Sequence, residues 1–332
     1  MQEKKYYFSS MFGRKVITVI IAVTIFYILM VVYSDANQMI KYLHNIDIGF
    51  VSLILLSFLI SILIKSVRQS YLLNSISIRL GFVQNVVLYI AGLSMTITPG
   101  GMGQMIKSHY LLKHQNQPIS KTLPIVIAER YNDILALVSF TILFAAIENL
   151  TILMIPIFAI GIAIAISGVM IRSRNLFHFL QALLMKISIF KGLKNSSAEF
   201  NSTLVSLFEN RKLFFSWLLS MAAFFFDAVG IFMCFQSLKL NFDFGFTTAF
   251  GFSSIVLGAI SFIPAGAGVT EVSFVQLLSH YGVEISEATA VVLLVRLTSM
   301  WFLTFLGIVA TKFITRNSRL AAATVDSKKI TR

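Results

Sequence analysis

The chain consists mainly of long apolar runs that are separated by short polar segments. The eight runs cover residues 16–33, 50–64, 80–98, 123–147, 152–171, 213–238, 244–263 and 288–313. A helix needs about 20 apolar residues to cross a hydrocarbon core of roughly 30 Å, so the pattern predicts membrane-spanning helices. The first run follows a basic start and is too long for a signal-peptide core, so we expect it to be a retained span.

Two of these runs end in short stretches that are copies of each other in composition. Residues 99–103 have the sequence PGGMG, and residues 264–268 have the sequence PAGAG. An arginine follows each copy within the next apolar run: Arg130 comes 31 residues after Pro99, and Arg296 comes 32 residues after Pro264. Paired Gly/Pro interruptions in corresponding halves of a membrane protein indicate a binding site near the bilayer midplane.

Composition strengthens the membrane assignment and changes the meaning of the net charge. The chain is 57% hydrophobic and only 12% charged, whereas a soluble globular domain carries roughly 25% charged residues. The net charge of +13 would suggest a nucleic-acid partner in a soluble protein. In a membrane protein such an excess marks cytoplasmic loops beside anionic lipid, so no nucleic-acid partner is expected.

The basic residues outside the apolar runs predict the topology. Four lie in the amino-terminal tail, three in the second connection (65–79), seven in the central segment 172–212 and six in the tail from Lys312, whereas segments 34–49 and 239–243 hold one each. The positive-inside rule then places both termini in the cytoplasm of a multi-pass cell-membrane protein. We expect a first repeat and the start of the second half at 1–171, with a tail at 1–15; a cytoplasmic amphipathic linker at 172–212; the rest of the second repeat at 213–314; and a basic tail at 315–332.

This topology leaves one apolar run too many in each half. Two runs lie between the cytoplasmic connection 65–79 and the external residue Glu148, and two crossings would return Glu148 to the cytoplasm. The run that breaks at Pro99 is therefore predicted to enter the membrane and come back, and the run that breaks at Pro264 to do so from the other side. The predicted fold class is an all-α integral membrane protein with about six transmembrane helices and two re-entrant hairpins in an inverted repeat. Such hairpins imply a polar interior; the alternative is two kinked complete spans packed by small residues.

Ionisable residues inside the apolar runs are the candidate site, because burying a charge in a membrane is costly. Glu129 and Asp133 are four residues apart and share a helical face, and Arg130 and Asp133 are three apart and can pair. Arg296 has no acid one turn away in its own helix. Pro124 suggests a helix start that leaves Glu129 only a turn or two deep. The candidate substrate-binding residues are Lys107, Glu129, Arg130, Asp133, Asp227, Glu271 and Arg296, with Gly101, Gly103, Gly266 and Gly268 as backbone that can approach a ligand.

Each candidate also has a purely structural interpretation. Arg130 and Asp133 can form an intrahelical pair, and Asp227 can bond a neighbouring helix. Glu271 can be an exposed loop acid, and Lys107 can anchor an amphipathic helix to the lipid surface. The sequence contains no P-loop, no H-E-x-x-H motif and no G-x-S-x-G elbow, and its single cysteine and five histidines show no metal-ligand spacing. No metal, cofactor or ATP hydrolysis is therefore expected.

Four segments in this order resemble the lysylphosphatidylglycerol synthase transmembrane-region family. They are TPGGMGQMIKSHYLL, IVIAERYNDILAL, SFIPAGAGVTEVSFVQLL and VLLVRLTSMW. The resemblance covers roughly residues 14 to 315 and implies a flippase-like integral membrane protein in which Glu129, Arg130, Asp133, Gly268, Glu271 and Arg296 match the family's polar positions. The chain departs from the family at Gln104 and Lys107, where the family usually has Glu and Arg.

The resemblance implies a lipid transporter without aminoacylation activity of its own, because about 20 residues follow the last span. We expect this non-enzyme to move an anionic phospholipid or a polyprenyl-phosphate glycolipid between leaflets. Its partners would be membrane lipids and, on a separate chain, a glycosyltransferase or an aminoacyltransferase. The alternatives are an ion-coupled carrier for a small solute and a non-transporting partner that holds a glycosyltransferase at the membrane.

Overall fold

The computed structural model describes residues 23–30, 48–96, 106–172 and 197–314, together with the single residues 21, 32, 46 and 104. All regular structure in these ranges is helical, as the sequence predicts. Outside the described residues lie the tails 1–15 and 315–332, part of the first predicted span, most of the 172–212 linker, and the candidates Gly101 and Gly103.

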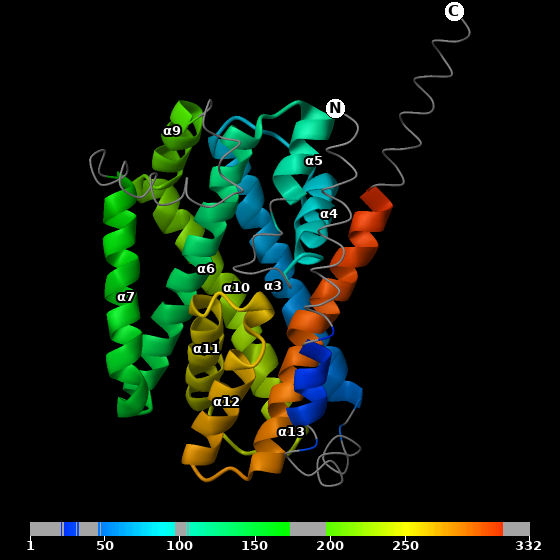
Figure 1. Cartoon of the computed structure of the whole chain (residues 1–332), viewed down its shortest axis with the longest axis vertical. Coiled ribbons are helices and arrows are strands. Elements are labelled where there is room, and N and C mark those ends of the chain that lie inside the picture. Colours follow the sequence, from blue (N-terminus) through cyan, green and yellow to red (C-terminus); the bar gives the residue numbers. More distant parts are fainter. Residues whose placement is uncertain are drawn as a thin grey trace, which may run out of the picture.

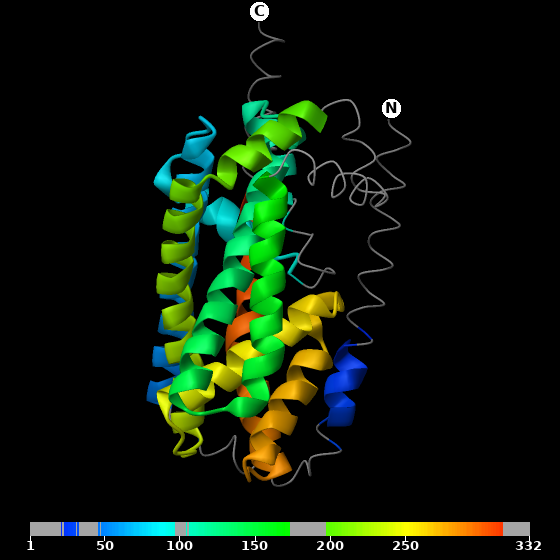
Figure 2. The same ribbon diagram turned by 90° about the vertical axis from the view of Figure 1, so that its left-hand side faces the viewer.

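Within the described residues, five helices are long and apolar enough to cross a membrane. They are α3 (Ile48–Ser75), α6 (Ile119–Ile147), α7 (Thr151–Arg172), α10 (Asn210–Ser237) and α13 (Ile285–Arg296), which continues through the π-helical turn η4 (Leu297–Trp301) to residue 314. They run side by side along the long axis of the molecule (Figures 1 and 2). Residues 23–30, within the first predicted span, are helical as well.

The two broken runs form hairpins of short helices that enter from opposite ends. The first consists of α4 (Phe82–Leu93) and α5 (Ile106–Gln115); the second consists of α11 (Phe244–Ile260), the 3₁₀ turn η3 (Pro264–Gly266) and α12 (Val269–His280). At 1.5 Å per residue, α4 is about 18 Å long and α11 about 26 Å, so both are short of the roughly 30 Å core. Figure 1 shows the first hairpin at the end of the molecule where α9 (Ser197–Leu207) lies and the second at the opposite end. The predicted pair of re-entrant hairpins in an inverted repeat is thus confirmed.

The second hairpin turns at the Pro/Gly stretch because its backbone there suits only small residues. Gly266 and Gly268 have φ angles of +63° and +87°, in the left-handed region that favours glycine. A Cβ on Gly266 would lie 2.7 Å from the Thr270 hydroxyl oxygen and 3.0 Å from Cα of Gly258. The turn therefore packs directly on the end of α11.

The first hairpin is held by the last helix that the structure describes, which ends at residue 314. Gly307 approaches so closely that a Cβ there would lie 2.2 Å from the backbone nitrogen of Ser94, at the end of α4. One turn later the hydroxyl of Thr311 lies 3.3 Å from the Ala91 carbonyl oxygen and 3.2 Å from the Ser94 hydroxyl oxygen. The backbone of the last described helix thus packs directly against the end of α4, and this contact joins the two halves of the sequence.

Candidate functional site

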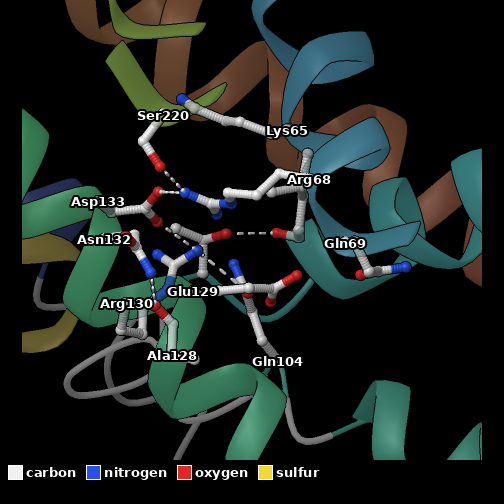
Figure 3. A network of polar contacts seen from close by, with 12 residues as sticks. Lys65, Arg68, Gln69, Gln104, Ala128, Glu129, Arg130, Asn132, Asp133 and Ser220 are labelled. Carbon is white, nitrogen blue, oxygen red and sulfur yellow. Dashed lines mark hydrogen bonds and ion pairs between the residues drawn. The ribbon is translucent and has the colours of Figure 1, made fainter. Parts of the chain in front are cut away.

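The first polar cluster lies between α3, α6 and α10 and the start of the α5 segment (Figure 3). α6 begins at Ile119, before Pro124, so Glu129 lies ten residues into the helix rather than one or two turns. Glu129 is fully buried, and Asp133 is 7% exposed. The predicted depth was wrong because Pro124 sits in the second turn of the helix instead of at its start.

Two arginines share one carboxylate at the centre of this cluster. Asp133 accepts from Arg68 Nη1 at Oδ1, 2.5 Å away, and from Arg130 Nη2 at Oδ2, 2.9 Å away. The predicted Arg130–Asp133 pair is therefore present, but it is half of a larger arrangement. Arg68 also donates to the hydroxyl of Ser220 on α10 at 2.6 Å, and Arg130 donates to Oε1 of Gln104 at 3.1 Å.

Lys107 points into the protein rather than anchoring α5 to the lipid surface. It is 4% exposed, forms an ion pair with Glu129, and donates to Gln69 Oε1 at 2.9 Å. Its ammonium nitrogen lies 4.9 Å from the centre of the Tyr89 ring. A Cβ on Gly92 would lie 3.0 Å from Cδ of Lys107, so the glycine in α4 makes room for the lysine stem. The lipid-anchor interpretation of Lys107 is thus wrong.

Asp227 pairs with a lysine that the sequence had placed in a loop. Lys65 Nζ lies 2.6 Å from Asp227 Oδ2 and 4.0 Å from the centre of the Phe224 ring. Both Lys65 and Arg68 belong to α3, which continues to Ser75, so the connection between the helices is shorter than the predicted 65–79. The two basic residues were assigned to the wrong environment because the apolar run ends eleven residues before the helix does.

The second polar cluster is built around Glu271 and Arg296. Arg296 Nε donates to Glu271 Oε1 at 2.6 Å, and Arg296 Nη2 donates to the Ala265 carbonyl at 2.7 Å. Glu271 also accepts from the Tyr27 hydroxyl at 2.6 Å and from the Gly268 N–H at 2.8 Å, which caps α12. Glu271 is fully buried, so it is not an exposed loop acid, and it is the partner that Arg296 lacks in its own helix.

The two clusters repeat one geometric element. In each half an arginine donates to a side chain near the re-entrant turn: Arg130 to Gln104, 26 residues earlier, and Arg296 to Glu271, 25 residues earlier. The sequence did not reveal Tyr27, Gln69 or Gln104 as members of the clusters. Among the described residues no group of three or more His, Cys, Asp or Glu side chains could hold a metal ion.

Residues 17–307 match the family of the lysylphosphatidylglycerol synthase TM region. The chain belongs to this family. It is also 30% identical over 321 residues to a UPF0104 membrane protein of Pyrococcus horikoshii, with 89% of the chain and 95% of the relative covered. Two UPF0104 membrane proteins of Methanocaldococcus jannaschii are each 25% identical, one over 67% of this chain and 94% of the relative, the other over 94% and 97%.

The match to the lysylphosphatidylglycerol synthase TM region extends over both halves of the inverted repeat. It includes the α3–α6 cluster and the α12–α13 cluster, and it ends at Gly307, where the last helix meets α4. This chain is therefore a multi-pass member of a membrane protein family, and its buried charges lie within the region that the family shares.

Proposed function

We propose that this protein moves a lipid with an anionic head group, a phospholipid or a polyprenyl-phosphate lipid, from one leaflet of the cell membrane to the other. The observation that carries the proposal is the pair of arginine-centred clusters at re-entrant elements that enter from opposite ends. A site that is reached from both sides in turn needs such an inverted arrangement. The membership in a family named after a lipid synthase supports a lipid as the substrate.

Energetics favour a transport role for the buried charges. A single charged side chain at the bilayer centre costs at least about 2.5–3.5 kcal/mol. Nine charged side chains lie in the two clusters, and the free-energy cost of keeping them in a membrane favours a functional role for them. They are Lys65, Arg68, Lys107, Glu129, Arg130, Asp133, Asp227, Glu271 and Arg296.

In the proposed cycle, a lipid phosphate displaces the protein carboxylate from an arginine. Guanidinium groups bind phosphate with two parallel hydrogen bonds, so the exchange replaces one charge-assisted pair with another. The acyl chains stay in the bilayer, while the head group passes between the polar groups. We propose that the protein does no chemistry on this lipid, that both termini face the cytoplasm, and that any glycosyltransferase or aminoacyltransferase acts from a separate chain.

Reconstituted liposomes test this function. Purified protein is expected to speed the transbilayer movement of fluorescent phosphatidylglycerol more than that of fluorescent phosphatidylcholine. Arg296→Gln is expected to abolish this movement. Arg79→Gln is the matched control, because Arg79 is an exposed loop residue and loses the same charge. Equal rates for both lipids, or no rate above that of empty liposomes, would contradict the proposal.

A further inference from the structure

The first cluster carries one more positive charge than negative charge among the described residues. Arg68 and Arg130 are both bonded to Asp133, whose single charge cannot neutralise two guanidinium groups. The other two ion pairs of the cluster are each neutral: Lys65–Asp227 and Lys107–Glu129. The excess of one positive charge therefore falls on the two arginines.

The same two arginines also have hydrogen-bond donors without acceptors. The Nε and Nη2 atoms of Arg68 and the Nε atom of Arg130 are buried and have no partner among the described residues. A buried donor without a partner costs about 1–3 kcal/mol, and more when the group is charged. The Arg130 side chain is 32% exposed, whereas that of Arg68 is fully buried. An incoming anion would thus meet Arg130 first, with Arg68 acting through Asp133.

The second cluster, in contrast, is complete. Glu271 neutralises Arg296 one for one, and both of its carboxylate oxygens accept hydrogen bonds. In the first half the equivalent place is taken by Gln104, whose amide oxygen accepts from Arg130 but brings no charge. The two clusters therefore differ at one position. The amide of Gln104 leaves the charge of Arg130 without a counter-charge from this position, whereas the carboxylate of Glu271 balances the charge of Arg296.

We infer that Gln104 makes the first cluster the resting anion site, which takes a phosphodiester head group of net charge −1, whereas Glu271 keeps the second cluster closed to anions. One negative charge balances the excess of the first cluster. A phosphomonoester carries a charge of about −1.5 to −2 at pH 7. Its negative charge would exceed the single positive charge that the buried cluster has to offer. This inference rests on the proposed function in taking the ligand to be a lipid.

Two substitutions at Gln104 test the inference, because charge and hydrogen bonding predict opposite orders. Gln104→Glu keeps an acceptor for Arg130 and adds the missing negative charge. Gln104→Met keeps the length of the side chain, removes the acceptor and leaves the excess charge. If Gln104 only held Arg130 in place, the methionine variant would be the more damaged one; if it sets the charge, the glutamate variant would lose anion binding.

The measurement is calorimetric titration of the detergent-solubilised full chain with dioctanoyl lipids. The natural protein and Gln104→Met are expected to bind phosphatidylglycerol at least tenfold more tightly than phosphatidylcholine, and no less tightly than phosphatidic acid. Gln104→Glu is expected to lose this preference. A preference that survives in Gln104→Glu and falls in Gln104→Met would overturn the inference, as would equally tight binding of inorganic phosphate.

Liposome transport separates a failure of this inference from a failure of the proposed function. Phosphatidylglycerol movement that is equally fast in the natural protein and in Gln104→Glu overturns the role of Gln104 and leaves lipid transport standing. Gln104-dependent binding without any movement supports the anion site and overturns transport.

Discussion

Substitution of Arg296 and of Arg130, the arginines that follow the two re-entrant turns, should lower the free energy of unfolding by very different amounts. Arg296→Gln leaves Glu271 fully buried without a cation, because its remaining partners, Tyr27 and the Gly268 N–H, are neutral. Breaking a buried ion pair by removing one partner costs about 3–5 kcal/mol, which lowers the ratio of folded to unfolded protein by between about two and four orders of magnitude.

Arg130→Gln removes the same charge but should lower the free energy of unfolding far less. Asp133 keeps Arg68 at 2.5 Å, and Gln104 is neutral, so no charge is left without a partner. Arg130 is also the more exposed arginine, and pairs near water contribute little. We expect the loss to be no more than about 1 kcal/mol.

Unfolding in mixed micelles measures both costs on one scale. Protein in a mild detergent is titrated with sodium dodecyl sulfate, and unfolding is followed by circular dichroism, with Arg79→Gln as the control for loss of a charge. The double variant Arg296→Gln/Glu271→Gln should recover at least half of the stability lost in Arg296→Gln, because no buried charge remains unpaired. An Arg130→Gln variant that is as unstable as Arg296→Gln would refute the charge count of the first cluster.

Three further outcomes are expected. Arg296→Lys should restore only part of the lipid movement that Arg296→Gln loses in liposomes, since lysine keeps the charge but not the two-pronged donor; full activity of Arg296→Gln would remove this residue from the mechanism. In a Cys234→Ser background, a cysteine at Asn116 should react with an impermeant maleimide only from the cytoplasm and one at His280 only from outside, and labelling of both from one side would exclude the inverted repeat. Gly307→Ala should lower the midpoint of the same detergent unfolding transition, because its Cβ meets the backbone of α4, and an unchanged midpoint would show that the two helices can separate without cost.

The sequence predicted the hairpins because two independent patterns agreed. The Pro/Gly stretches after Pro99 and Pro264 marked where the apolar runs break, and the distribution of lysine and arginine required one non-crossing run in each half. The spacing of Arg130 and Asp133 likewise predicted their pair. Patterns of this kind can be recognised from the order of residues along the chain, without knowledge of the tertiary structure.

Other members of the site depend on contacts that no local pattern records. Arg68 lies beyond the end of an apolar run, and only the continuation of α3 to Ser75 and the approach of Ser220 make it an interior residue. Gln104 stands out in the sequence only as a departure from the family pattern, and its hydrogen bond with Arg130 is visible only in the structure. Tyr27 resembles any aromatic residue of a span, and its bond to Glu271 crosses 244 positions of the chain.

The close approach of Gly307 to Ser94 has a consequence for how the protein is made. The ribosome delivers α4 and α5 early, but the surface against which the end of α4 packs belongs to the last helix, more than 200 residues later. The first hairpin must therefore stay in the membrane without this neighbour until more than 200 further residues have been made. The proposed anion site draws Gln104 and Lys107 from this hairpin, so the hairpin that contributes them gains its full packing only after the helix that contains Gly307 has been made.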